Sequence, residues 1–221
     1  MKDFYCFRLP ANVIVAARTG SGKSSLMAAI IKNRARLVNI QPKRIIWSYS
    51  VDQPDFFKSL PKEVELHRGL PDLDSLGIYQ DGKLAHHTWI IIDDLTDILN
   101  NEISKLFTIY SHKKLITSFL LCQNFYDKNV HLRTITLNAH YLIIFPNPRN
   151  PSQFHKIAAQ IFPTKYKSLI RVYEEIARIP YSYLLIDTSI LCPDDLRVRS
   201  DLLNPEGSIV HALTENDVEY K

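Results

Sequence analysis

The sequence feature that most constrains the fold is ARTGSGKS at residues 17–24, together with its flanks. An apolar run, VIVA at residues 13–16, precedes it, and the helix-forming run SLMAAII at residues 25–31 follows it. A strand, a glycine-containing turn and a helix in this order make the phosphate-binding loop called Walker A, here with Ala17 in place of the usual first Gly. The segment therefore predicts a nucleotide-binding site. The alternative is a fortuitous turn between a strand and a helix.

In such a loop, backbone N–H groups and the positive end of the helix are expected to hold the α- and β-phosphates. Lys23 would reach the β- and γ-phosphates, and Ser24 would ligate Mg²⁺. A methyl group at Ala17 is tolerated if φ is negative there. The predicted binding residues are Ala17, Arg18, Thr19, Gly20, Ser21, Gly22, Lys23, Ser24 and Ser25.

A second motif is WIIIDD at residues 89–94. Its apolar residues are typical of a fully buried parallel strand, and the strand ends in two carboxylates, the pattern called Walker B. In a P-loop enzyme the first acid holds Mg²⁺ and the second orients and deprotonates the attacking water. We therefore assign Asp93 to the metal and Asp94 to the base. The alternative is that both residues cap a following helix.

A third strand, ITSFLLC at residues 116–122, ends in Gln123. Ligands bind at the carboxyl ends of strands in open α/β sheets. Gln123 is therefore a candidate sensor of the γ-phosphate or the attacking water, and the alternative is a plain turn residue.

Along the whole chain, apolar runs alternate with helical patterns, as in βαβ units. This predicts an α/β fold with a mainly parallel sheet and helices on both faces. With 221 residues, of which 46% are hydrophobic, the chain can bury one substantial core. We expect one domain over residues 1–200. Beyond it the pattern decays, which predicts a loosely ordered tail over residues 201–221.

Composition sets weaker bounds. A formal charge of +4 permits contact with an anionic polymer without establishing it. Three widely separated cysteines suggest neither a disulfide framework nor a zinc site. No apolar run approaches the roughly 18 residues that span a bilayer, and the start lacks the apolar core of a signal peptide. We expect a soluble intracellular protein with no membrane partner.

Together the motifs resemble the genome-packaging ATPases of Polintons and related adintoviruses, in the FtsK/HerA-type branch of P-loop motors. The resemblance covers about residues 10–200. Walker A alone is shared by many families, so the more diagnostic strings are RTITLNAHY at residues 133–141 and NPR at residues 147–149. Supporting strings are RIIW at 44–47, QP at 53–54, GLP at 69–71, IIDDL at 91–95, LF at 106–107, SH at 111–112, QN at 123–124 and PYSYLLID at 180–187.

The resemblance implies a RecA-like P-loop NTPase core with the Walker B and Gln strands beside the Walker A strand. It implies ATP as the nucleotide and a homo-oligomeric ring, a hexamer or pentamer, with ATP sites between neighbours. Double-stranded DNA would pass through the ring into a preformed capsid, so a capsid or portal component would be a partner. The protein would work at assembling virions in the nucleus or cytoplasm of a host cell. Many motors of this branch carry Glu at the position of Asp94, although the Asp-Asp pair is similar to the Polinton pattern.

A ring motor needs a cation from the neighbouring subunit to stabilise charge on the transferring phosphoryl group, and planar Arg suits this role. The candidates are Arg149 and Arg133, both expected in loops near strands. DNA would be gripped through its phosphates, since packaging must work on every sequence. Lys113 and Lys114 are candidates to face the channel, and the alternative for them is a solvated charge pair.

Two other functions stay open. A small-molecule kinase uses the same cradle, although such kinases usually carry an Arg-rich lid and the sequence shows no compact one. A nucleotide-gated scaffold without turnover is suggested by the departures at Ala17 and Asp94.

Overall fold

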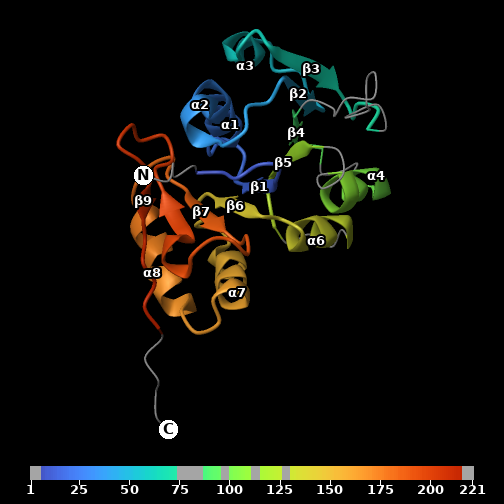
Figure 1. The fold of residues 1–221 in the computed structure, drawn as a ribbon. Helices are drawn as coiled ribbons and strands as arrows, with labels where there is room; N and C mark the ends of the chain where they lie inside the picture. The colour runs from blue at the N-terminus through green and yellow to red at the C-terminus, as the bar shows by residue number, and fades with distance from the viewer. Residues whose placement is uncertain (1–5, 74–86, 96–99, 111–114, 126–129, 216–221) are drawn as a thin grey trace.

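The computed structural model describes residues 6–73, 87–95, 100–110, 115–125 and 130–215 (Figure 1). Within these residues, nine strands form one sheet in the order β3-β2-β4-β5-β1-β6-β7-β8-β9. The strands are β1 (Asn12–Ala16), β2 (Arg44–Tyr49), β3 (Val64–Arg68), β4 (Thr88–Asp93), β5 (Ile116–Cys122), β6 (Tyr141–Ile144), β7 (Leu184–Asp187), β8 (Val198–Ser200) and β9 (Ile209–Val210). The α-helices are α1 (Lys23–Lys32), α2 (Arg34–Leu37), α3 (Pro54–Ser59), α4 (Asn101–Lys105), α6 (Val130–Leu137), α7 (Pro151–Ile161) and α8 (Tyr166–Ile176), with a π-helical turn η2 (Leu106–Tyr110) and a 3₁₀ turn η3 (Asp194–Leu196).

The strands from β3 to β6 in the sheet order are parallel. Every residue of β1, β4, β5 and β6 is buried, which is what near-continuous apolar runs produce in a parallel sheet covered on both sides. The predicted RecA-like, mainly parallel α/β architecture is confirmed. The strand order corrects one detail. The Gln strand β5 lies directly beside the Walker A strand β1, and the Walker B strand β4 lies one strand further away.

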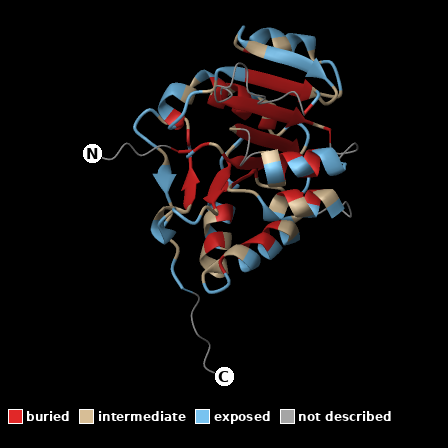
Figure 2. Cartoon of the chain, turned by 45° about the vertical axis from the view of Figure 1, so that its right-hand side comes forward, coloured by how far each residue is buried: buried red, intermediate tan, exposed pale blue. Residues whose placement is uncertain are grey.

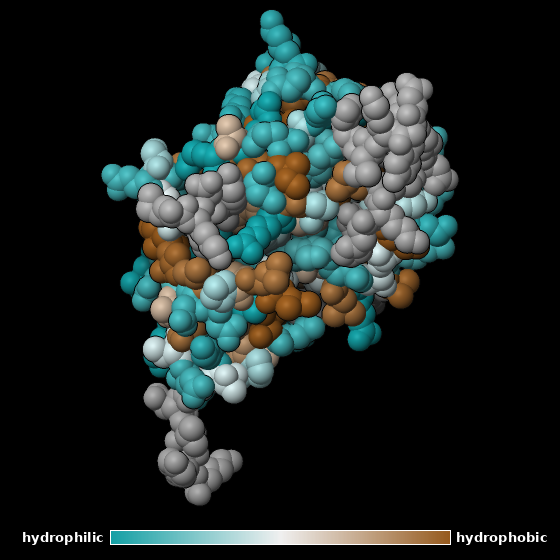
Figure 3. All heavy atoms as spheres, in the orientation of Figure 1, coloured by the Kyte–Doolittle hydropathy of each residue, from teal (hydrophilic) through white to brown (hydrophobic). Residues whose placement is uncertain are grey.

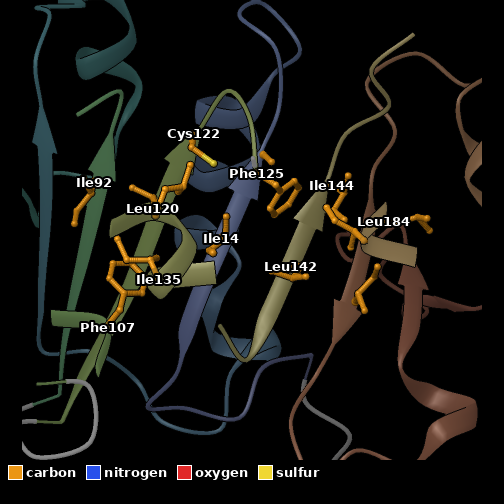
Figure 4. Packing of buried hydrophobic residues seen from close by; sticks show 14 of the residues in the cluster. Ile14, Ile92, Phe107, Leu120, Cys122, Phe125, Ile135, Leu142, Ile144 and Leu184 are labelled. Atoms are coloured by element: carbon orange, nitrogen blue, oxygen red, sulfur yellow. The ribbon is translucent and has the colours of Figure 1, made fainter. Parts of the chain in front are cut away.

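Two apolar cores lie on opposite faces of this sheet, because successive side chains of a strand point to opposite sides. Figure 4 shows one face, where Ile92, Leu120, Ile14, Leu142 and Leu184 come from five neighbouring strands. Helices α4, α6, α7 and α8 cover that face, while α1 and α2 cover the other (Figure 1). The buried strands between them are drawn in red in Figure 2, which also colours the buried parts of the helices red. The prediction of helices on both faces is confirmed.

The sheet continues past β6 in antiparallel form. Strand β7 runs antiparallel to β6 with Leu184 opposite Ile144, so the amino end of β7 lies at the carboxyl edge of the parallel strands. Across this extension Arg199 Nη2 lies 2.9 Å from Asp187 Oδ2, and both residues are buried. A buried charge is retained only with such a partner.

The expected loose tail from residue 201 is wrong for the first part of that segment. Leu202 is fully buried, and β9 pairs with β8. The Arg36 guanidinium donates to the carbonyl oxygens of Leu203 and Asn204. Backbone pairing at the sheet edge therefore orders this stretch, although its sequence lacks the hydrophobic periodicity that predicts a helix or a strand. Residues 216–221 of the expected tail lie outside the described residues.

Candidate active site

The phosphate loop joins β1 to α1, as predicted, and its two left-handed positions are both glycines. Gly20 has a φ of 79° and Gly22 a φ of 93°, conformations that residues with a Cβ rarely adopt. Gly22 caps α1, and its carbonyl oxygen accepts the first helical hydrogen bond, from Leu26 N at 2.8 Å. The N–H groups of the first helical turn have no intrahelical acceptor and are available for an anion. All of the predicted binding residues lie in this turn or the first turn of the helix.

Ala17 does not disturb the loop. Ala17 is not one of the described non-glycine residues that have a positive φ. Its methyl group is therefore tolerated, as expected for a negative φ at this position. The residue is buried, and its N–H donates to the carbonyl oxygen of Cys122 at 3.1 Å. The start of the loop is thereby tied to the end of β5.

Asp93 ends β4 and faces the start of α1. Ser24 Oγ donates to Asp93 Oδ2 at 3.2 Å, although the two residues are far apart in sequence. Asp93 is buried, and within the described chain its Oδ1 atom has no hydrogen-bond partner. A hydroxyl beside a carboxylate with an unused buried oxygen is the donor set that Mg²⁺ takes in nucleotide sites, where phosphates complete the shell. The residues present therefore fit the predicted ion.

A buried indole also holds this carboxylate. Trp47 on β2 donates from Nε1 to Asp93 Oδ2 at 3.2 Å. Trp47 was not predicted from the sequence as a residue of the site. The strand register explains the contact, because Trp47 pairs with Ile91, and Asp93, two positions along β4, shares the face of Ile91.

The pKa of the Asp93 carboxyl is raised to about 6. Burial is the largest cause, followed by the negative charge of Asp94, while Lys23, Ser24 and Trp47 act in the opposite direction. Burial and the charge of Asp94 thus destabilise the ionised carboxylate, and a bound cation would offset this destabilisation.

Asp94 stands beyond the strand in a left-handed conformation, with a φ of 52°. Its Oδ1 atom lies 3.0 Å from Lys23 Nζ. Ser50 Oγ donates to the Asp94 carbonyl oxygen at 3.0 Å, which holds the backbone in this turn. A left-handed turn aims the second carboxylate at the loop lysine, whereas Asp93, still in the strand, faces Ser24. The motif's two acids therefore have different neighbours.

A cleft of about 290 Å³ brings two other predicted residues together. Gln123 and Arg149 line it with Arg18, Thr19 and Asn124. Gln123 follows β5, and Arg149 lies in the turn after β6, where its N–H donates to Asn147 Oδ1 at 3.2 Å. Both side chains are exposed to this cleft edge of the sheet. Arg149 thus lies beside the phosphate loop of its own chain.

Arg133, the other predicted finger, is not among the described residues that line this cleft. Arg133 was expected in a loop, but it lies within α6, where Leu132 and Ile135 pack into the core and leave Arg133 exposed. The helical spacing of those two apolar residues outweighs the β-branched run around them. Lys113 and Lys114 lie outside the described residues.

In the described ranges, no group of three or more His, Cys, Asp or Glu residues is placed to hold a metal by itself. No described helix is long and apolar enough to cross a membrane. On the face drawn in Figure 3, hydrophobic residues occur in separate groups among hydrophilic ones.

No family profile matches the sequence, and no curated protein sequence matches it. Among solved structures, the chain is similar to the cytoplasmic domain of the Type VII secretion ATPase EccC from Thermomonospora curvata, with a TM-score of 0.50 and 12% identity, over 94% of this chain and 26% of that one. It is also similar to B204, the DNA-packaging ATPase of Sulfolobus turreted icosahedral virus, with a TM-score of 0.49 and 15% identity over 80% and 92% of the two chains. The genome packaging NTPase B204 from Sulfolobus turreted icosahedral virus 2, in complex with ATP-gammaS, gives a TM-score of 0.46 and 19% identity over 80% of this chain and 92% of that one. The EccC likeness agrees with the RecA-like α/β fold described above.

Proposed function

We propose that this chain hydrolyses ATP in a ring of identical subunits and that hydrolysis drives double-stranded DNA into a viral capsid. The observation that carries the ATPase part is the convergence of Lys23 and Ser24 from the phosphate loop with Asp93 and Asp94 from the end of β4. The packaging part rests on the sequence resemblance to Polinton-type packaging ATPases, which the strings at residues 133–141 and 147–149 carry.

The loop residues bind the triphosphate. N–H groups at the start of α1 contact the α- and β-phosphates, and the Lys23 ammonium contacts the β- and γ-phosphates. Ser24 and Asp93 would hold Mg²⁺, which would neutralise charge on the phosphates. Because Lys23 is buried and its nearest carboxylate is Asp94, its charge is directed to this edge of the sheet.

Asp94 is the general base. Its carboxylate is outside the strand and partly exposed, so it can reach a water beside the terminal phosphate. Gln123, which lines the cleft beside the phosphate loop, orients the same water or senses the γ-phosphate. Arg149 supplies positive charge to the transferring phosphoryl group. Its place beside its own chain's loop favours action within one subunit, and Arg133 remains a candidate for the finger from a neighbour.

DNA is contacted through its phosphates, for which a net positive charge is suited. Lys113 and Lys114 are the proposed channel residues. The ring, a capsid or portal partner and work at assembling virions in a host cell belong to the same proposal.

The chemistry is tested by following γ-phosphate release and, in parallel, phosphoryl transfer to nucleosides and nucleotides. We expect phosphate release by the wild-type chain and none above background for Lys23→Ala. A phosphorylated acceptor would instead identify a kinase. Binding of ATP without release, even in a single turnover, would identify a nucleotide-gated scaffold.

A further inference from the structure

A second cleft opens beside the phosphate loop, on the side away from the two acids. It has a volume of about 470 Å³, and its lining includes Ser21, Pro146, Asn147, Ile179 and Tyr181. In the sheet order, Asp93 on β4 lies two strands to one side of β1, while this cleft lies over the ends of β6 and β7 on the other side. The phosphate loop stands between the two.

The antiparallel pairing of β7 creates this cleft. Ile144, the last residue of β6, is opposite Leu184, the first residue of β7. The residues after β6 and those before β7 therefore meet at the carboxyl edge of the parallel strands. Pro146 and Pro148 come from the first segment, and Ile179 and Tyr181 come from the second.

Tyr181 is the unusual residue of this cleft. Three quarters of its surface is exposed, and its φ of 58° is left-handed. Its Cδ1 atom lies 3.5 Å from the position that a Cβ at Gly22 would occupy. The ring therefore lies next to Gly22, the N-cap residue of α1. A strained backbone that presents an aromatic ring to solvent beside a ligand loop is typical of a ligand clamp.

The orientation of a bound nucleotide follows from the acids. Ser24, Asp93 and Lys23 fix the β- and γ-phosphates on the β4 side of the loop. The nucleoside must then leave the loop on the opposite side, where Tyr181 and Ile179 are exposed. The cleft volume falls within the range of about 300–1,000 Å³ that small-molecule sites occupy.

We propose that this second cleft binds the nucleobase and that the Tyr181 ring stacks against it. The inference rests on the proposed function and deepens it by naming the base subsite. Stacking is open to every base, because every base has a π-face. The site therefore takes nucleoside triphosphates as a class and discriminates little between bases.

The test compares a ligand that has a base with one that has only phosphates. Binding of ADP and of inorganic triphosphate is measured by calorimetry for the wild-type chain and for Tyr181→Ala, Tyr181→Phe and Ile190→Ala. Ile190 is an exposed residue beyond the other end of β7 and serves as the matched control. Tyr181→Asn repeats the measurement with a side chain that suits left-handed backbone.

We expect Tyr181→Ala to weaken ADP binding by about 5- to 150-fold, the range of base–aromatic stacking, and to leave triphosphate binding within about twofold. Tyr181→Phe and Ile190→Ala should bind both ligands like the wild type. Unchanged ADP binding in Tyr181→Ala and Tyr181→Asn would overturn the proposal, as would an equal loss for both ligands, which would place the effect on the loop through Gly22. A wild-type chain that binds neither ligand would overturn the proposed function as well.

Discussion

Lys23 Nζ lies 3.0 Å from Asp94 Oδ1, so the terminal phosphates of a bound nucleotide would compete with the proposed base for the cation of the phosphate loop. The Lys23 side chain is 7% exposed and the Asp94 side chain 38% exposed. The pair is therefore open to solvent on the Asp94 side, which weakens the attraction between its members.

This competition predicts that Asp94→Asn separates binding from hydrolysis. At such exposure an ion pair stabilises its two partners by about 0.2–1 kcal/mol. Without this pair Lys23 is free to contact the phosphates, so ATP should bind about 1.5- to 5-fold more tightly. Loss of the base should slow hydrolysis by about 10²- to 10⁴-fold. Calorimetry and single-turnover assays measure the two effects, with Asp55→Asn, a fully exposed acid on α3, as the control. Weaker ATP binding, or hydrolysis at the wild-type rate, would contradict the assignment.

Trp47 should act as a positioning residue for Asp93 through its indole N–H. Trp47→Phe removes a donor that favours the ionised carboxylate, so the acid limb of the pH–rate profile should move up by about one pH unit or more. Activity should converge with that of the wild type at alkaline pH. Trp89→Phe is the matched control, because Trp89 is equally buried and, within the described chain, its Nε1 atom makes no hydrogen bond. Equal shifts in both variants would show that only packing is involved.

Titration of Asp93 should appear in the stability of the metal-free chain. Its pKa rises from 3.8 to about 6, chiefly by burial, so the folded state binds the proton more tightly than the unfolded state. The free energy of unfolding should then fall as the pH rises from about 4 through about 6, with a total loss of about 3 kcal/mol.

Asp93→Asn has no such proton to lose. Urea unfolding in EDTA should therefore show its stability advantage over the wild type growing by that amount between pH 4 and pH 7. A pH-independent difference would mean that the carboxylate is not buried as described. At pH values below about 6, Mg²⁺ should also protect the wild type less, because the ion competes with the proton.

Arg149 lines the same cleft as the phosphate loop of its own chain, which predicts action within one subunit. Mixed assemblies test this. Inactive Lys23→Ala chains and inactive Arg149→Ala chains are combined and the ATPase rate is measured. An arginine that acts within its own subunit leaves every mixed site broken, so we expect no recovery. Recovery of activity on mixing would show that Arg149 acts on the neighbour's nucleotide, and the same mixture with Arg133→Ala examines the other candidate.

The convergence of the two motifs was predictable from sequence because parallel strands place their carboxyl ends at one edge of the sheet. Lys23, Ser24, Asp93, Asp94 and Gln123 all follow from that rule, and the structure places them at that edge. The left-handed turn at Asp94 was not predictable, because the residue in that conformation is not a glycine.

Contacts that depend on register or on antiparallel pairing were also missed. Trp47 reaches Asp93 because of the alignment of β2 with β4, which an apolar run does not specify. Tyr181 reaches the loop because β7 reverses direction beside β6. Arg133 was expected in a loop near a strand, whereas packing of Leu132 and Ile135 places it within a helix.

The most direct test of the account is the steady-state ATPase rate of the wild-type protein with and without duplex DNA, with the oligomer mass determined under the same conditions. A DNA-translocating ring predicts a ring-sized assembly whose rate rises several-fold with DNA, with a stimulation that weakens as salt increases. Vigorous hydrolysis by a strict monomer, at a rate that duplex DNA does not change, would contradict it.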